Sequence, residues 1–273
     1  MKRVGVGLTG LLVLIYLGYG SAMTLLHTRY IYPFSPEPFT APGFQSHEIA
    51  VAGTTPLTVY VHQSARPDAP VVVYYMGNLG ALGLFQTIFD LHIAHDRTIV
   101  AMTFRGGGGQ AGVPSETGLK ADALATFDAL PQLVAPTHGP VFVQGYSLGT
   151  GLALHVAARR TFAGLILDAP YARLCEVMAA RAWLPACLMP FVQKWDSLAD
   201  ATGLTMPVLI QQGTADQTIP VAQGMKVAAA IGAGGGQVWF QPLPGGLHNN
   251  LLDVPPYVAV LNGFIDSGKL PVE

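Results

Sequence analysis

At the centre of the 273-residue chain, residues 141–149 read VFVQGYSLG. The β-branched start of this stretch predicts a buried strand, and a helical pattern begins at Leu148. Ser147 lies between the two, in a G-x-S-x-G motif that places a nucleophile on a sharp strand-to-helix turn. A side chain at Gly145 or Gly149 would collide with the neighbouring strand or helix. The motif therefore predicts a nucleophilic serine just after a strand.

Strand and helix patterns alternate along most of the remaining chain. Short β-branched runs, typical of strands buried on both faces of a parallel sheet, lie between longer stretches with helical periodicity. This alternation predicts an α/β fold with a mostly parallel central sheet flanked by helices. Ligands bind beyond the carboxyl ends of such strands, so we expect the site residues there. The expected strands are residues 47–51, 57–62, 71–75, 98–103, 141–143, 165–167, 208–210 and 238–240, and the expected helices are residues 116–130, 148–160, 222–231 and 255–264.

A serine hydroxyl needs a base that removes its proton and a carboxylate that orients the base. His248 is the expected base, because it lies in a glycine-rich loop after the last strand, whereas the other histidines fall at positions typical of structural or surface residues. Asp216 follows the strand at 208–210 and is the expected acid. The chain order Ser147, Asp216, His248 is a known order of such triads. Asp168, which also follows a strand, is the alternative acid.

Acyl transfer also needs N–H donors for the negative charge that develops on the carbonyl oxygen of the substrate. The backbone N–H of Leu148 directly follows the nucleophile and is the first expected donor. The second should come from the loop after the strand at 71–75. We select the backbone N–H of Asn78, because Gly77 lets the chain turn close to the site.

Together these residues resemble the α/β-hydrolase superfamily, and more narrowly its membrane-anchored, short-cap serine hydrolases of the bud-emergence type. Two positions depart from that pattern: Met76 stands where the family usually has a histidine, and glycines fill positions 107–109, where a tyrosine is common. The resemblance covers nearly the whole chain. It rests on YIYP at 30–33, GN at 77–78, FRGGGG at 104–109, PSETGL at 114–119 with Asp122, GYSLG at 145–149, WDSL at 195–198, GTAD at 213–216 and HN at 248–249.

The resemblance implies an α/β-hydrolase fold with a short cap over about residues 171–203. It implies a serine hydrolase that cleaves carboxylic ester or thioester bonds through an acyl-enzyme on Ser147. Apolar side chains in the cap would suit an apolar or lipid-like substrate. Two alternatives stay open: a serine peptidase of the prolyl-peptidase type, and a catalytically silent binding module that keeps the fold.

The N-terminus carries a long apolar stretch. Residues 4–26 include no charged side chain, and 23 helical residues suffice to cross a hydrocarbon core of about 30 Å. Lys2 and Arg3 precede this stretch, which predicts that the bulk of the chain lies on the periplasmic or extracellular side. We expect residues 1–28 to form an anchor helix that projects without a matching surface on the domain, and residues 29–273 to form the hydrolase domain. The alternative is a signal segment that is cleaved, with secretion of the domain.

Composition bears on several other classes of protein. The net charge is −2 and no basic run exceeds two residues, which argues against nucleic-acid binding. Cys175 and Cys187 are too few for a disulfide scaffold or a four-cysteine metal site, and whether they pair with each other is open. The sequence has no metal-ligand cluster or dinucleotide fingerprint, so we expect no metal or cofactor. The expected partners are a small-molecule ester or acylated substrate and a membrane around the N-terminal helix.

Overall fold

The computed structural model describes the backbone of residues 2–271 and the side chains of residues 9–271. In this part of the chain eight strands form one sheet, in the spatial order β1-β2-β4-β3-β5-β6-β7-β8. Neighbouring strands are parallel except at β2, which runs antiparallel to β1 and β4. The prediction of a mostly parallel sheet is therefore confirmed. The strands are β1 (Gln45–Ile49), β2 (Leu57–His62), β3 (Val71–Tyr75), β4 (Thr98–Met102), β5 (Val141–Tyr146), β6 (Gly164–Asp168), β7 (Val208–Gly213) and β8 (Val238–Leu243).

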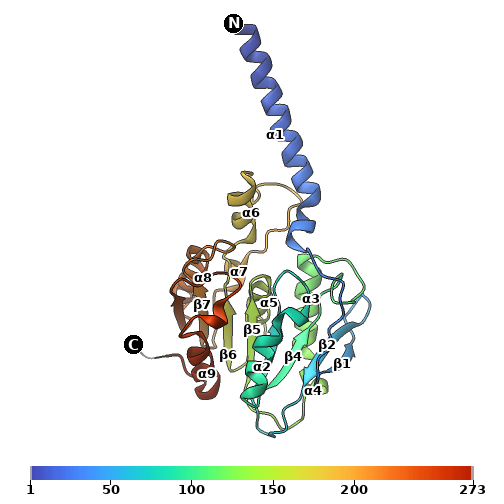
Figure 1. Cartoon of the computed structure of the whole chain (residues 1–273), viewed down its shortest axis with the longest axis vertical. Helices are drawn as coiled ribbons and strands as arrows, with labels where there is room; N and C mark the ends of the chain where they lie inside the picture. The colour runs from blue at the N-terminus through green and yellow to red at the C-terminus, as the bar shows by residue number, and fades with distance from the viewer. Residues whose placement is uncertain (1, 272–273) are drawn as a thin grey trace.

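Helices cover both faces of the sheet (Figure 1). On one face α5 packs on β5 and contacts α3 and α7, and α7 in turn contacts α8. On the other face α2 lies against β4 and α9 against β7. The helices are α1 (Lys2–Ile31), η1 (Leu82–Phe85), α2 (Gln86–Ala94), α3 (Glu116–Asp128), α4 (Leu130–Leu133), α5 (Leu148–Ala157), α6 (Leu174–Ala182), α7 (Ser197–Asp200), α8 (Val221–Ala233), η2 (Leu251–Asp253) and α9 (Tyr257–Ser267).

Some elements differ from the ranges that the sequence predicted. The helix expected over residues 116–130 is interrupted before Leu130, because Pro131 stands in the first turn of α4 and cannot continue a helical hydrogen-bond ladder. β1 begins two residues earlier than expected, since its pairing with β2 sets its register. Helices α2, α6 and α7 are additional to the expected set.

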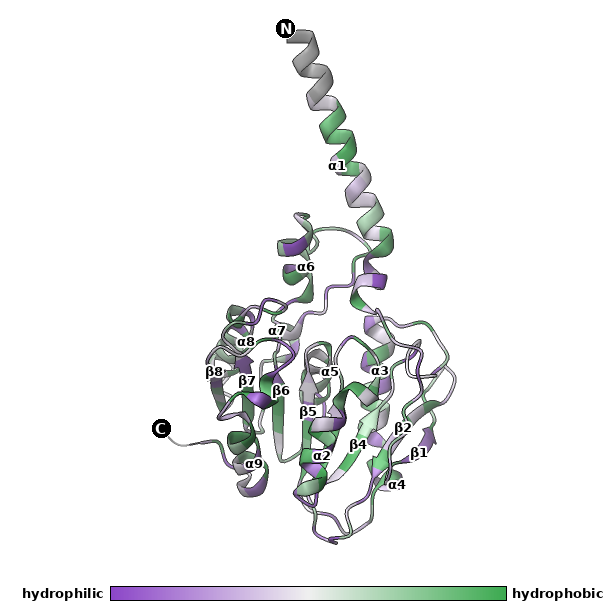
Figure 2. Cartoon of the chain, in the orientation of Figure 1, coloured by the Kyte–Doolittle hydropathy of each residue, from purple (hydrophilic) through white to green (hydrophobic). Residues whose placement is uncertain are grey.

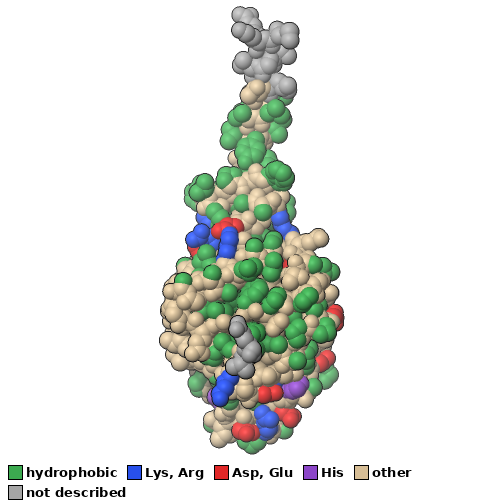
Figure 3. Space-filling model, turned by 90° about the vertical axis from the view of Figure 1, so that its left-hand side faces the viewer, with side chains coloured by type: hydrophobic (Ala, Val, Ile, Leu, Met, Phe, Trp, Pro, Cys, Tyr) green, Lys and Arg blue, Asp and Glu red, His purple; other side chains and the backbone are tan. Residues whose placement is uncertain are grey.

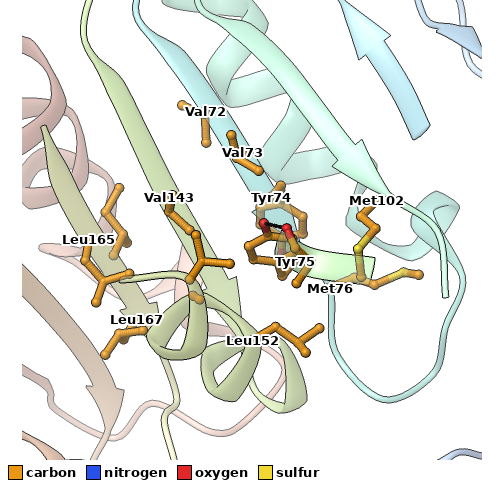
Figure 4. Packing of buried hydrophobic residues seen from close by; sticks show 14 of the residues in the cluster. Val72, Val73, Tyr74, Tyr75, Met76, Met102, Val143, Leu152, Leu165 and Leu167 are labelled. Atoms are coloured by element: carbon orange, nitrogen blue, oxygen red, sulfur yellow. Dashed lines mark hydrogen bonds between the residues drawn. The ribbon is translucent and has the colours of Figure 1, made fainter. Parts of the chain in front are cut away.

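The middle of the sheet supplies most of the hydrophobic core. β3 has the sequence VVVYY, and all five residues are buried because β4 and β5 pair with its two edges while helices cover its faces. Figure 4 shows Val73 and Tyr75 of this strand in the same cluster as Val143 of β5 and Leu152 of α5. The paired strands therefore form a rigid base for the loops that follow them.

Helix α1 is one continuous helix that projects from the globular part of the chain (Figures 1 and 2). Its segment Thr9–Ile31 has a mean hydropathy of 1.6 and is 6% buried in its most apolar window. By length and composition it could cross a membrane, and a signal sequence would meet the same criteria. The continuous helix predicted over residues 4–26 is present and extends to Ile31.

The second half of α1 contacts the rest of the chain. The hydroxyl of Tyr16 donates a hydrogen bond to the carbonyl of Trp183 at 3.0 Å. The hydroxyl of Tyr19 donates to the carbonyl of the residue before Trp183 at 3.1 Å. The prediction that this helix projects from the domain is confirmed, and these two hydrogen bonds show that its second half also has polar contacts with residues 182 and 183.

Residues 171–203 include α6, which lies at the end of the sheet from which α1 projects, and α7, which lies beside α5 and α8; we call this segment the cap (Figure 1). A disulfide between Cys175 and Cys187 joins α6 to the loop after it, which settles the pairing that the sequence left open. Ala186 and Val192 are buried beside this disulfide in a small apolar cluster of their own. The cap thus has a local core that is separate from the core under the sheet.

Candidate active site

Ser147 occupies the turn between β5 and α5. Its backbone has φ 51° and ψ −115°, in the positive-φ region that residues with side chains rarely adopt. A Cβ atom at Gly145 would lie 2.5 Å from the carbonyl oxygen of Gly149, and one at Gly149 would overlap the carbonyl oxygen of Tyr75 in β3. The predicted steric need for glycine on both sides of the serine is confirmed.

Three side chains from separate loops form a chain of hydrogen bonds. Ser147 Oγ lies 3.0 Å from Nε2 of His248, and Nδ1 of the same ring lies 2.7 Å from Oδ2 of Asp216. The other oxygen of Asp216 accepts the backbone N–H groups of Thr218 and Ile219 at 2.7 and 2.8 Å. The Asp216 side chain is fully buried, so water does not screen its charge from the imidazole. Such an arrangement can take a proton from the serine and stabilise the imidazolium that forms.

The alternative acid, Asp168, lies elsewhere. Its Oδ2 accepts hydrogen bonds from Gln144 at 2.6 Å and from the Tyr257 hydroxyl at 3.0 Å. Burial raises the pKa of Asp168 to about 6. Its main-chain carbonyl accepts the N–H of Ser147 at 2.9 Å, so this residue supports the serine turn through its backbone. The ring nitrogen of His248 that faces an acid is bonded to Asp216 instead.

Sequence reasoning missed two residues that hold the histidine loop. The hydroxyl of Tyr146 donates hydrogen bonds to the carbonyl of His248 at 2.6 Å and to Oδ1 of Asn249 at 3.1 Å. The Tyr146 ring also lies beside the imidazole, with 5.3 Å between centroids. Only their positions in the sequence could have indicated these two residues: Tyr146 directly precedes Ser147, and Asn249 directly follows His248.

The loop after β3 lies on the other side of the serine. Asn78 and Leu148, whose backbone N–H groups are the expected oxyanion donors, line the same cavity as Ser147. A Cβ atom at Gly77 would lie 2.9 Å from the Tyr146 ring, so only glycine lets this loop approach so closely. Met76 is fully buried in the hydrophobic core (Figure 4). The unusual residue at position 76 therefore contributes to packing under the loop.

A cavity of about 420 Å³ lies over Ser147. Helix α1 forms one side of it, and α6 with the loop that follows forms the other. Most of the lining is apolar, so the cavity could hold a hydrocarbon group of a ligand. The main apolar residues of the lining are Met23, Ile31, Leu174, Val177, Met178, Leu184, Met189 and Val192.

A second hollow, of about 380 Å³, also reaches Asn78. His248 and Tyr146 line it, together with Phe85, residues of α2 and the loop at 249–253. The serine–histidine pair therefore lies between two hollows, one beside α1 and the cap and one beside α2. A substrate cleaved at Ser147 could place its two halves in different hollows.

Comparisons with known proteins identify the fold. Lysophosphatidylserine lipase ABHD12 of Danio rerio is 26% identical over 237 residues, which cover 76% of this chain and 60% of the lipase. Alpha/beta hydrolase domain-containing protein aho-3 of Caenorhabditis elegans is 24% identical over 196 residues, which cover 71% of this chain and 57% of the relative. The Pyrococcus furiosus esterase Pf2001 superposes with a TM-score of 0.69 at 14% identity, over 86% of this chain and 98% of the esterase. The chain therefore has the α/β-hydrolase fold.

Other findings limit how far the likeness to known proteins extends. The acylaminoacyl peptidase of Pyrococcus horikoshii has a TM-score of 0.69 at 16% identity, over 84% of this chain and 42% of the peptidase. No family model matches the sequence. The chain spans about 60% of the length of the first curated relatives it matches. The narrower resemblance to the bud-emergence type stays a prediction, because none of these proteins tests it.

Other histidine and cysteine side chains of this chain have partners away from the site. His92 is fully buried and its Nε2 lies 2.8 Å from Oε1 of Gln144, and burial lowers its pKa to about 3. Cys175 is joined to Cys187. Within the residues that the structure describes, no group of three or more His, Cys, Asp or Glu side chains is placed to hold a metal ion.

Proposed function

We propose that this α/β-hydrolase is a serine hydrolase that cleaves carboxylic ester or thioester bonds through an acyl-enzyme. The observation that carries the proposal is the chain of hydrogen bonds from Ser147 through His248 to Asp216, with distances of 3.0 and 2.7 Å. Its position at the floor of an apolar cavity supports an apolar substrate. Relatives and structural neighbours named as a lipase and an esterase support ester-type chemistry.

In this mechanism Ser147 is the nucleophile. His248 takes the hydroxyl proton as Oγ attacks the carbonyl carbon of the substrate, while Asp216 orients the ring and stabilises the imidazolium. The imidazolium then gives its proton to the departing alcohol or thiol, which leaves the acyl group on Oγ. Next, His248 removes a proton from water, which attacks the acyl carbon and releases the carboxylic acid. The backbone N–H groups of Asn78 and Leu148 would hold the oxyanion in both steps.

The proposed substrate is a small molecule with an apolar acyl group. That group would occupy the cavity between α1 and the cap, whose volume of about 420 Å³ lies in the range of ligand pockets. The leaving group would face the hollow beside α2, which His248 also lines. In this arrangement the proton donor, His248, would lie next to the atom that leaves.

We also propose that α1 is a retained membrane anchor and that the hydrolase domain lies on the non-cytoplasmic side. Tyr16 and Tyr19 bond to the cap, and Tyr19 and Met23 line the cavity over Ser147, so cleavage before Met23 would remove part of the wall. The disulfide fits an oxidising compartment, and the two N-terminal cations fit a cytoplasmic N-terminus. Fractionation with N-terminal sequencing tests this: a soluble protein that begins at Met23 would contradict it.

Labelling of the full-length protein with fluorophosphonate probes tests the catalytic proposal. We expect covalent labelling of the wild type at Ser147 and none of the Ser147→Ala variant. Gly232→Ala, a helical position with open space around it, is a matched control that should label like the wild type. A folded wild type that resists probes of several sizes would favour the silent binding module. Turnover of peptides but not of esters would favour the peptidase alternative.

A further inference from the structure

The outer end of the cap presents an apolar surface beside α1. Residues 182–193 read AWLPACLMPFVQ and include no charged side chain. Within this stretch Trp183, Leu188 and Phe191 are 85%, 85% and 90% exposed. They belong neither to the small cluster around the disulfide nor to the lining of the cavity. We call these three side chains the cap tip.

The cations that flank this stretch are turned toward the protein. Arg181 donates a hydrogen bond to the carbonyl of Gln217 at 2.8 Å. Lys194 donates to the carbonyls of Ala186 and Met189 at 2.9 and 2.6 Å. Figure 3 shows hydrophobic side chains along the helix and the neck of the molecule, and the first charged side chains gather below that level. The outer face of the cap therefore matches the apolar surface of α1.

Contacts with α1 fix the height of the cap tip along the helix. The hydroxyl of Tyr16 bonds to the carbonyl of Trp183, so the two lie at the same level. A hydrocarbon core of about 30 Å takes about 20 helical residues, so a span that starts at Val4 ends near Met23. Tyr16 and Tyr19, which bond to the carbonyls of Trp183 and Ala182, come seven and four residues before Met23, so Trp183 would lie about 6–10 Å inside the hydrocarbon. Only an apolar surface is stable at that depth.

We propose that the cap tip inserts into the lipid bilayer beside α1, and that the acyl chain of the substrate enters the cavity from the bilayer, between α1 and α6. The proposal rests on the hydrolase function proposed above. Tyr19 and Tyr30 line the cavity and are 43% and 61% exposed, so the α1 side of its wall reaches the protein surface. Lipid is favoured over a second copy of the chain, because the tip continues the apolar surface of the candidate membrane helix.

Quenching by brominated lipids tests the insertion. The full-length protein is reconstituted in vesicles whose acyl chains carry bromine near their middle, and its tryptophan emission is compared with that of a Trp183→Phe variant. The difference isolates Trp183 from the other two tryptophans, Trp195 and Trp239. The emission of the wild type minus that of the Trp183→Phe variant is the emission of Trp183. We expect this emission to be much weaker in brominated vesicles than in vesicles without bromine. Emission that stays unchanged would refute insertion.

Hydrolysis by a cap-tip variant tests the entry route. The variant combines Trp183→Asn, Leu188→Ser and Phe191→Asn, because Trp183 and Phe191 have φ of 56° and 65° and asparagine tolerates that region. Hydrolysis of dissolved p-nitrophenyl acetate should stay within about twofold of the wild-type rate, whereas hydrolysis of p-nitrophenyl palmitate held in vesicles should fall at least about tenfold. Met225→Ser, which removes a 56% exposed apolar side chain on α8, should change neither rate.

The outcomes separate the two proposals. A wild type that hydrolyses neither ester would contradict the hydrolase function, whatever the quenching result. Hydrolysis of both esters with an unaffected cap-tip variant would overturn the entry route and leave the hydrolase function standing. Unquenched Trp183 together with a dimer that the cap-tip variant cannot form would assign this surface to a second copy of the chain.

Discussion

Replacing Gly149 by alanine should displace the serine turn. The new Cβ atom would overlap the carbonyl oxygen of Tyr75 and lie 2.6 Å from that of Met76, whereas real Cβ atoms keep 3.0 Å or more. Both acceptors belong to the backbone at the end of β3, which is paired on both edges, so the start of α5 must move by about 1 Å instead.

The size of the effect follows from that displacement. Overpacking costs about 1–3 kcal/mol, and the rigid backbone partners place Gly149→Ala at the upper end. At about 2–4 °C per kcal/mol, the melting temperature should fall by about 6–12 °C. A displacement of about 1 Å at Ser147 should also slow ester hydrolysis about 100-fold.

Thermal unfolding followed by tryptophan fluorescence, and the rate of fluorophosphonate labelling, measure the two effects. Gly232→Ala in α8 is the control, because nothing lies within 4 Å of its Cβ position. Alanine there should raise stability by about 0.5–1 kcal/mol, since it restricts the unfolded chain. A Gly149→Ala protein that melts within about 2 °C of the wild type and labels at the same rate would show that the packing argument is wrong.

Asp216→Asn should lower kcat/KM for an ester by about 10³–10⁴-fold, whereas Asp168→Asn should keep it within about threefold; the reverse pattern would identify Asp168 as the acid. Because burial raises the pKa of Asp168 to about 6, its contribution to stability is present below pH 4 and is lost as the pH rises through 6. Urea unfolding between pH 4 and 7 should therefore show a smaller loss of stability for Asp168→Asn than for the wild type. Equal losses in the two proteins would contradict the raised pKa of Asp168. Replacing Cys175 and Cys187 by alanine should destabilise the cap by about 3 kcal/mol. Hydrogen exchange should then become faster over residues 174–194 and change little elsewhere. Exchange at the wild-type rate would mean that the cap does not depend on the disulfide.

The central strands could be predicted because burial on both faces leaves continuous β-branched runs in the sequence. β2 and β3 have the expected bounds. β5 and β7 run three residues farther than expected, through Gln144 in one and Gln211 and Gln212 in the other. Backbone pairing continues through these polar residues, so a prediction based on hydrophobic residues ends the strands too early.

Helix α2 shows a different limit. Only Ile88, Phe89 and His92 of its nine residues are buried, which is too short a pattern to separate a helix from a loop.

The meeting of Ser147, Asp216 and His248 could also be predicted, because parallel strands deliver the loops that follow them to the same edge of the sheet. Their catalytic roles stay a proposal. The contacts of Tyr146 with the histidine loop could not be predicted, since no local pattern indicates where a hydroxyl in a motif will point. The disulfide was undecided for a similar reason: a separation of 12 residues permits a Cα distance of 5.0 Å but does not require it.

Hydropathy predicted that α1 exists, but neither its extension to Ile31 nor its surroundings. Lipid and an apolar protein surface favour the same side chains, so the pattern of residues 4–26 does not distinguish them. The hydrogen bond from Tyr16 to Trp183 joins positions 167 residues apart, and only the folded chain brings them together.

The second half of α1 supplies one wall of the cavity, so the candidate membrane helix and the cavity over Ser147 form one structural unit. Trimming the chain to residues 29–273 for crystallisation or inhibitor screening would remove Tyr19 and Met23 from the lining and leave the cavity without its α1 wall. Compounds selected on such a protein would be fitted to a shape that the intact chain never presents. Under the proposed function, changing the side-chain volume at Met23 while keeping its hydropathy would alter acyl selectivity from within the candidate membrane helix.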